Sequence, residues 1–224
     1  MKKVILSLAL LAGFASAAHA QQGVFRYGVK GGFNLSSYTG SDAGEVGYKP
    51  GFAAGAVVQY GFSDLVGIEV DALYSQKGTY VKNFNPASSS ANTNFRSTVQ
   101  YIDVPVLAHI TTGEDGKGLF FELGPQGSFL VATRDFTRPD GAGAGSPNEI
   151  TVNQNTDKLN KVAIGYVGGL GYQLTSGLGL GLRYTGDLSN VYKDSYQPLP
   201  GVTKTNNFRN STFQFQVHYL FASK

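Results

Sequence analysis

The 224-residue sequence contains no cysteine, little charge and only one long apolar run. Without cysteine no disulfide can stabilise an exported form of the chain, so another source of stability is required. Charged residues make up 15% of the sequence, which is few for a soluble β-protein with a solvated outer face. The formal charge of +3 includes Lys2 and Lys3, so the rest of the chain is nearly neutral, which argues against binding to nucleic acid.

The apolar run lies at the N-terminus, at residues 4–15. It follows Lys2 and Lys3 and precedes the small-x-small sequence Ala18-His19-Ala20, a pattern typical of a secretory signal peptide. The run is shorter than the roughly 20 residues of a membrane-spanning helix. We therefore expect residues 1–20 to be a signal peptide and residues 21–224 to form one exported domain without a helical anchor.

Eight segments of the remaining chain alternate apolar residues with small or polar ones. In the first segment, for example, Phe25, Tyr27 and Val29 alternate with Arg26 and Gly28. Each segment is about as long as a tilted strand that crosses the hydrocarbon layer. The segments occupy residues 25–35, 51–62, 66–75, 101–110, 119–131, 162–173, 178–188 and 212–221.

The connections between these segments alternate in length, as they do in outer-membrane barrels, where turns are short on the periplasmic side and loops are long outside. The even strand number also places both chain ends on the periplasmic side. We expect the long connections to be exposed and their Pro-, Ser- and Gly-rich tips, at 85–94 and 139–148, to be poorly ordered. The short connections are 63–64, 113–118 and 175–177, and the long ones are 37–50, 78–97, 133–161 and 190–210.

Alternation alone also fits a soluble barrel whose apolar face points inward around a ligand. Here the other face holds a few charges of both signs among many glycines, and the apolar face holds no charged residue. That distribution predicts an eight-stranded antiparallel transmembrane β-barrel, an all-β up-and-down meander with its apolar face toward lipid. Aromatic residues near the strand ends should form interfacial girdles: Tyr27, Phe52, Phe62, Tyr74, Tyr172, Tyr184, Tyr219 and Phe221.

The charges on the inward face are the candidate functional residues. They could form a network of ion pairs that plugs the barrel, or line a path for ions or protons. A barrel of eight strands is just wide enough for side chains to fill it, and unpaired interior charges are costly, so we favour a network with Arg183 at its centre. Its candidate members are Arg26, Lys30, Glu69, Asp71, Asp103, Glu122, Arg183 and Asp187.

Three other features have structural interpretations. His109 and His218 should face inward, but no spacing typical of a metal site accompanies them, so we expect neither metal nor cofactor. The glycines of 168–181 lie within strands rather than in a strand–turn–helix phosphate loop, and should open space inside the barrel. Pro105 and Pro125 predict bulges or local irregularities.

Several segments resemble the PorT-like outer-membrane β-barrel domain family. They are the glycine-rich strand pair at 163–184, the Tyr-x-acidic-x-Pro sequence at 101–105, and residues 123–130 and 28–34. The resemblance covers nearly the whole exported chain and implies an eight-stranded outer-membrane barrel. Its motifs are structural, so it implies no catalytic residue. One branch of that family is linked to protein secretion.

These observations lead to three hypotheses about function. The first is an integral protein of the outer membrane that acts through its loops, in adhesion or envelope integrity, with lipid and a surface ligand or protein as partners; deleting residues 134–160 should then abolish binding. The second is a narrow pore or an accessory factor in secretion. The third is an enzyme, which we do not expect, because the long connections contain no histidine to act as a base.

Overall fold

The computed structural model describes residues 23–41, 43, 46–84, 93–113, 116–139, 150–152, 156–193 and 207–221. The expected signal peptide, residues 1–20, lies outside this part of the chain, as do most of the connection tips expected to be poorly ordered. Within the described residues, no helix has the length and apolar character needed to cross a membrane.

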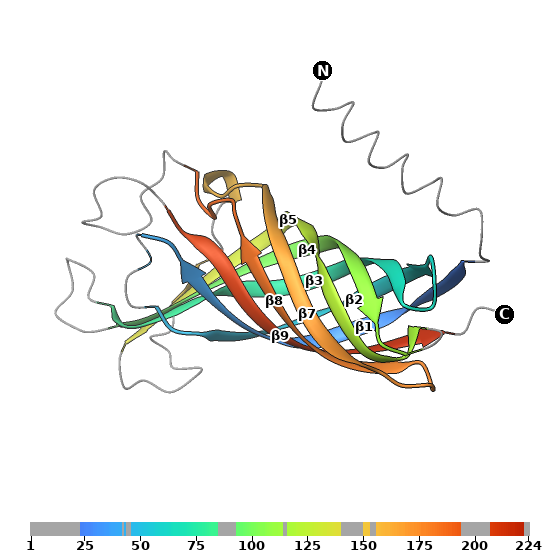
Figure 1. Ribbon diagram of the computed structural model, residues 1–224. Helices are drawn as coiled ribbons and strands as arrows, with labels where there is room; N and C mark the ends of the chain where they lie inside the picture. The colour runs from blue at the N-terminus through green and yellow to red at the C-terminus, as the bar shows by residue number, and fades with distance from the viewer. Residues whose placement is uncertain are drawn as a thin grey trace, which may run out of the picture.

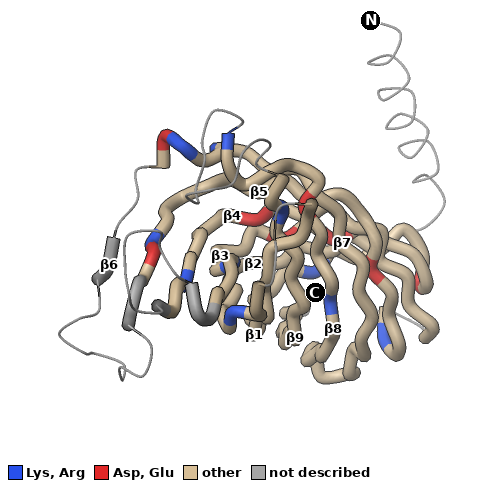
Figure 2. The backbone as a smooth tube through the Cα atoms, turned by 90° about the vertical axis from the view of Figure 1, so that its left-hand side faces the viewer, with Lys and Arg blue, Asp and Glu red and all other residues tan. Residues whose placement is uncertain are grey.

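Eight antiparallel strands form a closed ring, as the alternation predicted (Figure 1). Each strand pairs with its neighbours along the chain, and the last strand pairs with the first, so that β1, β9 and β8 lie side by side (Figure 2). A three-residue strand, β6 (Ile150–Val152), adds to the outer end of β5 without joining the ring, and a 3-10 turn, η3, covers Thr156–Lys158. The ring consists of β1 (Val24–Thr39), β2 (Lys49–Gly61), β3 (Val66–Phe84), β4 (Thr93–Thr111), β5 (Gly118–Pro139), β7 (Val162–Gln173), β8 (Leu178–Asp187) and β9 (Arg209–Phe221).

The two ends of the barrel differ. The short connections lie at one end together with residues 23 and 221, and this is called the turn end; the long connections lie at the opposite loop end (Figure 1). In the turn between β7 and β8, the Leu174 amide donates to the Leu178 carbonyl over 2.8 Å. Gly177 has a φ of +90° there, in the left-handed region that glycine adopts without steric cost.

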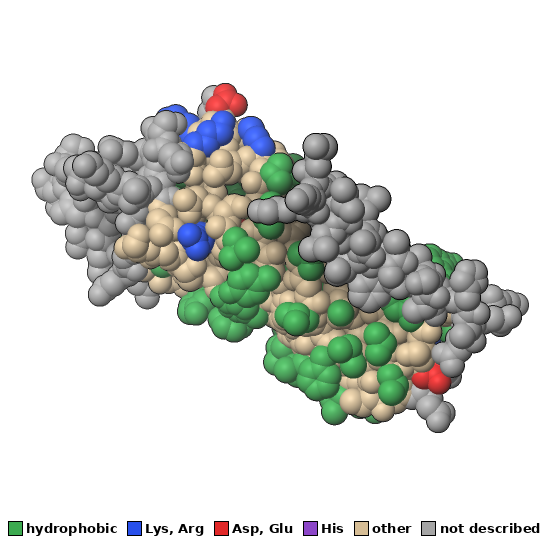
Figure 3. Space-filling model, turned by 45° about the horizontal axis from the view of Figure 1, so that its top comes forward, with side chains coloured by type: hydrophobic (Ala, Val, Ile, Leu, Met, Phe, Trp, Pro, Cys, Tyr) green, Lys and Arg blue, Asp and Glu red, His purple; other side chains and the backbone are tan. Residues whose placement is uncertain are grey.

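The apolar face of the strands points outward, as predicted. Along β9 the burial alternates with each residue, and its outward side chains are Phe213, Phe215, Val217, Tyr219 and Phe221. Figure 3 shows apolar side chains spread over the wall of the barrel. No Asp, Glu, Lys or Arg occupies an outward position in the eight alternating segments. A surface of this kind is stable only against lipid.

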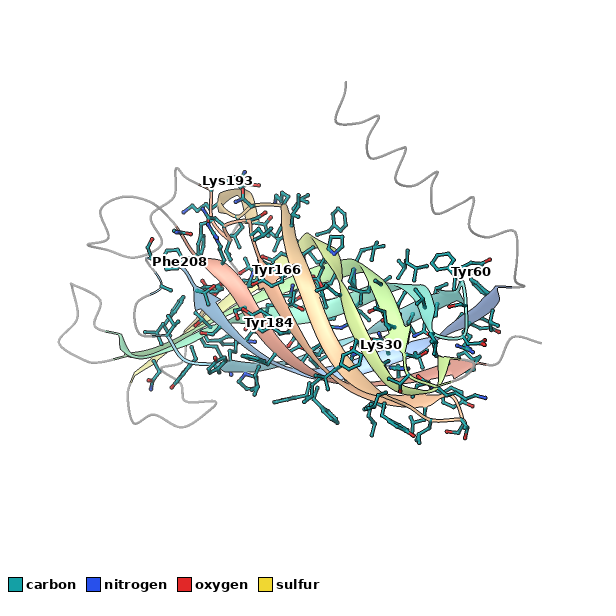
Figure 4. The ribbon with its side chains drawn as sticks, in the orientation of Figure 1. Lys30, Tyr60, Tyr166, Tyr184, Lys193 and Phe208 are labelled. Atoms are coloured by element: carbon teal, nitrogen blue, oxygen red, sulfur yellow. The ribbon has the colours of Figure 1, made fainter. Side chains whose placement is uncertain are left out.

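Aromatic side chains pair across strands toward both ends of this apolar wall. At the turn end the rings of Tyr27 and Phe221 lie 5.5 Å apart, and Tyr60 lies at the same end in Figure 4. Nearer the loop end the rings of Phe52 and Tyr74 lie 5.8 Å apart. These positions suit side chains with a wet edge and an apolar body at a membrane boundary.

Three strands extend furthest beyond the segments that the sequence indicated. Residues 78–84, 93–97 and 133–139 were expected in connections, but they continue β3, β4 and β5 as paired strands. Above the lipid layer an outward side chain need not be apolar, so alternation disappears while backbone pairing continues. Arg96 and Phe136, for example, are paired residues of β4 and β5 on the outward face.

The strand irregularities also differ from those expected. The β4–β5 register shifts between Gln100 and Tyr101, where Val131 is skipped, and the β3–β4 register shifts between Val81 and Phe84. Neither Pro105 nor Pro125 forms a bulge, because the register is the same before and after each proline. The expected local irregularity is present, since the β4–β5 pairing is interrupted opposite Pro125 and the β3–β4 pairing is interrupted at Pro105. A proline removes one donor without adding a residue, so it interrupts a ladder and leaves its register unchanged.

The outward face provides a test of the lipid boundary. Leu182 lies in the middle of β8 and Leu188 just beyond its loop end, and both are 58% exposed. We expect Leu182→Arg to lower the free energy of unfolding in lipid vesicles by roughly 2–4 kcal/mol, and Leu188→Arg by about 0–1 kcal/mol. Equal losses in urea titrations of the two variants would contradict this depth dependence.

Candidate functional site

The inward side chains fill the barrel in layers, and the central layer is ionic. Arg183 on β8 donates to Glu122 on β5 over 2.7 and 3.0 Å, to Asp71 on β3 over 2.8 Å and to Glu69 over 3.1 Å. Lys30 on β1 contacts Glu69 and lies 3.2 Å from Asp71. These five buried residues, called the central ion cluster, connect opposite walls of the barrel, and Figure 4 places Lys30 inside it.

Neutral amides complete the hydrogen bonding of the cluster. Gln59 donates to Glu69 Oε2 over 2.6 Å, and Gln216 donates to Glu122 over 3.3–3.4 Å. The cluster contains three carboxylates and two cations, and all five groups are almost inaccessible to solvent. In such surroundings the energetic cost of burying each charge is offset only by its partners. Removing one charged side chain leaves its partner unpaired in a medium of low dielectric constant.

Glycines on β7 make room for these side chains, as the sequence indicated. Gly169 pairs with Glu122 on one side and with Arg183 on the other. A Cβ atom at Gly169 would lie 3.1 Å from Glu122 Oε2, and one at Gly171 would lie 2.3 Å from the Phe120 ring. The inward face of β7, which has no side chains at these glycines, therefore leaves the space into which Glu122 and Phe120 of β5 project.

Asp103 and Asp187 lie in a second cluster around Lys77, called the Lys77 cluster. The Lys77 ammonium is 3.1 Å from Asp103 Oδ1 and 3.9 Å from Asp187 Oδ1, and Ser75 donates to Asp103 over 2.6 Å. Sequence reasoning missed Lys77 because it ended the third strand at Ser75. Continuing the same alternation by one residue pair would have placed Lys77 inward.

The remaining candidate, Arg26, lies at the turn end. Together with Gln59, His109 and Thr111 it lines a cavity of about 190 Å³ that opens at this end. None of the ion pairs described for the two clusters includes Arg26. Of the eight predicted interior charges, five therefore meet in the central ion cluster, two lie around Lys77, and Arg26 stands nearer the mouth.

Both histidines lie inside the barrel on the turn-end side of the central ion cluster. The His109 ring stacks on Phe120 with 5.0 Å between centroids, and His218 packs against the same phenylalanine at 5.8 Å. His218 Nε2 is hydrogen-bonded to Gln173, while His109 Nδ1 lies 3.7 Å from Glu69 Oε2. The sequence predicted their inward direction, but spacing along the chain could not place His109 beside Glu69.

The loop end is closed by apolar side chains, which we call the apolar cap. Tyr38 of β1 and Tyr101 of β4 contribute from the wall, and the rings of Tyr192 and Phe208 meet edge to face at 6.0 Å. Figure 4 shows Phe208 at this end of the barrel. The cap consists of Tyr38, Val99, Tyr101, Leu159, Val191, Tyr192 and Phe208.

The cap corrects the expectation that the long connections are simply exposed. The Asn160 amide donates to the Val191 carbonyl over 2.9 Å, and the Val191 amide donates to the Phe208 carbonyl over 2.7 Å. These bonds join the two connections on either side of the β7–β8 hairpin and turn their few apolar side chains inward. Such isolated residues in polar segments carry no periodic signal, so the sequence did not reveal them.

A comparison with known sequences identifies the fold. Residues 18–193 match a family described as "Outer membrane protein beta-barrel domain". The chain belongs to this family. It is therefore a protein of the outer membrane, with the turn end toward the periplasm and the loop end outside. The match ends before β9, the strand that closes the ring against β1.

Solved structures of other bacterial surface proteins are similar at low identity. Neisserial surface protein A is 16% identical, with 90% of this chain and 100% of that chain covered and a TM-score of 0.45. The attachment invasion locus protein Ail of Yersinia pestis is 13% identical, with coverages of 88% and 98% and a TM-score of 0.42; it has also been solved with the heparin analogue sucrose octasulfate. No curated protein matches the chain.

The central ion cluster predicts a large effect of removing Arg183. In Arg183→Ala three carboxylates would face Lys30 alone, and we expect a loss of about 3–5 kcal/mol in unfolding free energy with a clear fall in Tm. The measurement is a urea titration of the protein refolded into vesicles. An unchanged Tm would show that the cluster does not contribute to stability.

A second variant separates charge from packing. Arg183→Met keeps much of the side-chain volume, and adding Glu122→Gln removes one of the unpaired charges. We expect the double variant to be more stable than Arg183→Met alone. If both were equally destabilised, lost packing rather than charge imbalance would explain the result.

Proposed function

We propose that the protein acts at the cell surface, as an attachment or envelope-integrity protein whose loop end presents the binding surface. The observation that carries this proposal is the filling of the barrel. The central ion cluster connects opposite walls, the Lys77 cluster lies beside it, and the apolar cap covers the loop end. With the interior occupied in this way, the outer rim is the part of the molecule available to a partner.

The rim at the loop end carries an excess of exposed positive charge among the described residues. Lys158, Lys161 and Lys193 gather around η3, and the Lys193 amide donates to the Lys158 carbonyl over 3.1 Å. Figure 4 places Lys193 at this rim, and Figure 3 shows basic side chains beside the grey connections. Arg96 and Arg134 are also exposed, whereas Asp157 is the one exposed acid in the described part of this end.

This charge distribution favours an anionic partner. Exposed cations attract a polyanion over a distance of about a Debye length, roughly 8 Å at physiological salt. Lys161 directly precedes Val162, the first residue of β7, which faces outward and is 51% exposed, so this lysine lies at the edge of the lipid-facing wall. We therefore propose an anionic surface polysaccharide as the ligand class, held by Lys158, Lys161 and Lys193.

The assignment of the chain to a narrower branch of outer-membrane barrels is also a proposal. We infer that the chain lies in the PorT-like branch of outer-membrane barrels, on the basis of the motifs at 101–105 and 163–184. No feature of the described residues favours the secretion role linked to one branch, so we do not propose it. We propose no enzymatic role either, because His109 and His218 are buried inside the barrel on its turn-end side, away from the rim at the loop end.

The pore hypothesis predicts that the protein conducts ions, whereas our proposal predicts that it does not. We expect the refolded protein to give no steady current in planar bilayers, because side chains occupy its interior. A variant with the cap weakened by Tyr192→Ser and Phe208→Ser should remain silent, since the central ion cluster still blocks the middle. A stable single-channel current from the wild-type protein would favour the pore.

The proposed surface is tested by neutralising the three lysines together. Lys158→Gln, Lys161→Gln and Lys193→Gln should weaken binding of the refolded protein to immobilised heparin by about tenfold or more, with a smaller dependence on salt. Each lysine is also changed singly, and Lys117→Gln, at the turn end, is the control for these single variants and should bind normally. Undiminished binding by the triple variant would exclude this surface.

These substitutions are preferable to a deletion of residues 134–160. The structure places the end of β5 and Leu159 of the apolar cap within that range, so a deletion would disturb the fold as well as the surface. The three lysines are exposed and can be changed without removing packed side chains.

A further inference from the structure

We propose that Glu69, His109 and Glu122 form a binding site for a divalent transition-metal ion of the zinc type. The three residues come from the neighbouring strands β3, β4 and β5, and one ligand atom of each lies within 4.8 Å of the others. They are buried, with exposed fractions of 0% for Glu69, 6% for His109 and 2% for Glu122.

The strand register creates this grouping. His109 is paired directly with Glu122 across the β4–β5 ladder, and it faces Gly67 across the β3–β4 ladder, two residues before Glu69. All three side chains therefore project into the same level of the barrel. They are separated by 40 and 13 positions in the sequence, which is why no spacing motif indicated the site.

One buried nitrogen atom of the group is suitably placed to bind an ion. His109 Nδ1 is buried, has no hydrogen-bond partner among the described residues, and lies 3.7 Å from Glu69 Oε2. Buried polar atoms are nearly always paired, so this orphan requires an explanation. Ligand atoms around tetrahedral zinc are about 3.3 Å apart, because each bond is roughly 2.0–2.1 Å long, so only a small contraction would bring both atoms onto one ion.

The cations of the central ion cluster leave the proposed ligand atoms accessible. Lys30 and Arg183 contact Glu69 Oε1, and Arg183 contacts Glu122 Oε2. Within the described part of the chain, the other two oxygens, Glu69 Oε2 and Glu122 Oε1, receive hydrogen bonds from the neutral amides Gln59 and Gln216. The two cations then act as outer partners that hold the carboxylates in position, as such partners do around known metal sites.

Formal charge also favours a cation here. The cluster has three carboxylates and two positive groups, so one negative charge is left over in a buried place. A buried excess charge is costly unless another ion compensates it. A divalent ion would change the excess from −1 to +1, so the leftover negative charge attracts a cation without selecting its valence. The cavity bordered by His109, Gln59 and Thr111 provides access from the periplasm and space for water ligands.

The donor set selects the class of metal. One imidazole with two carboxylates suits zinc and its neighbours in the first transition row, whereas calcium and magnesium prefer oxygen ligands alone. Stacking on Phe120 fixes the plane of the His109 ring and so directs its Nδ1 toward Glu69.

The test measures metal binding by the full chain, refolded and without a polyhistidine tag. After treatment with EDTA and dialysis, we expect equilibrium dialysis to give about one bound Zn²⁺ per chain. Co²⁺ should give a visible absorption band that Zn²⁺ removes. Ca²⁺ should not compete. No stoichiometric Zn²⁺ binding, or equal competition by Ca²⁺, would overturn the proposal.

Variants assign the binding to this site. His109→Asn and Glu122→Gln should each weaken Zn²⁺ binding by at least tenfold. His218→Asn is the matched control, because His218 packs against the same Phe120 ring but belongs to no group of potential metal ligands in the part of the chain that the structure describes. Retained binding in His109→Asn, or an equal loss in His218→Asn, would overturn the assignment.

A folding measurement accompanies each variant. The heat-modifiable mobility of the barrel on a denaturing gel shows whether it has formed. If His109→Asn does not fold, Glu122→Gln and the Co²⁺ spectrum of the wild-type protein decide the question. A wild-type spectrum without evidence of a nitrogen ligand would count against His109.

Discussion

Closure of the backbone hydrogen-bond ring is the constraint on which the rest of this structure depends. In lipid no water can satisfy a free strand edge, so a β-protein is stable there only if its last strand pairs with its first. The pairing of β1 with β9, from Tyr27–Phe221 to Thr39–Arg209, meets this requirement. Closure with eight strands then fixes a narrow interior, and the narrow interior determines which side chains can occupy it.

Inside this ring, the sizes of the side chains on facing strands are complementary. Large groups on one wall are opposed by small ones on another, as Glu122 and Phe120 of β5 are by Gly169 and Gly171 of β7. The charged layer then fits without displacing the backbone, and the apolar cap separates it from the cell exterior. Without disulfides, the chain relies on the closed hydrogen-bond ring and on this packing of its interior.

The sequence allowed the fold to be predicted because lipid makes the alternation strict. Residues such as Phe213 and Phe215 had to face outward, and the strand number and the polarity of each face followed. The extensions of β3, β4 and β5 could not be predicted, since above the lipid the outward residue of a strand can be polar, as Arg96 is. The register shift at Val131 was equally hidden, because a bulge depends on the partner strand.

The inward direction of the charged residues was predictable in the same way, but their partners were not. Alternation placed Glu69, Glu122 and Arg183 inside, while their contacts depend on strand tilt and stagger around the whole ring. The sequence therefore could not divide the charges between the central ion cluster and Lys77, nor bring His109 to Glu69.

The apolar cap also has a consequence for the order of assembly. Its side chains come from positions as far apart as Tyr38 and Phe208, so it requires the first and last strands to be in place together. It cannot form while the barrel is still an open sheet. The lysines around η3 reach their final arrangement through the same connections, by way of the bond from Lys193 to Lys158. A ligand that recognises this rim would consequently distinguish a finished barrel from one still being inserted.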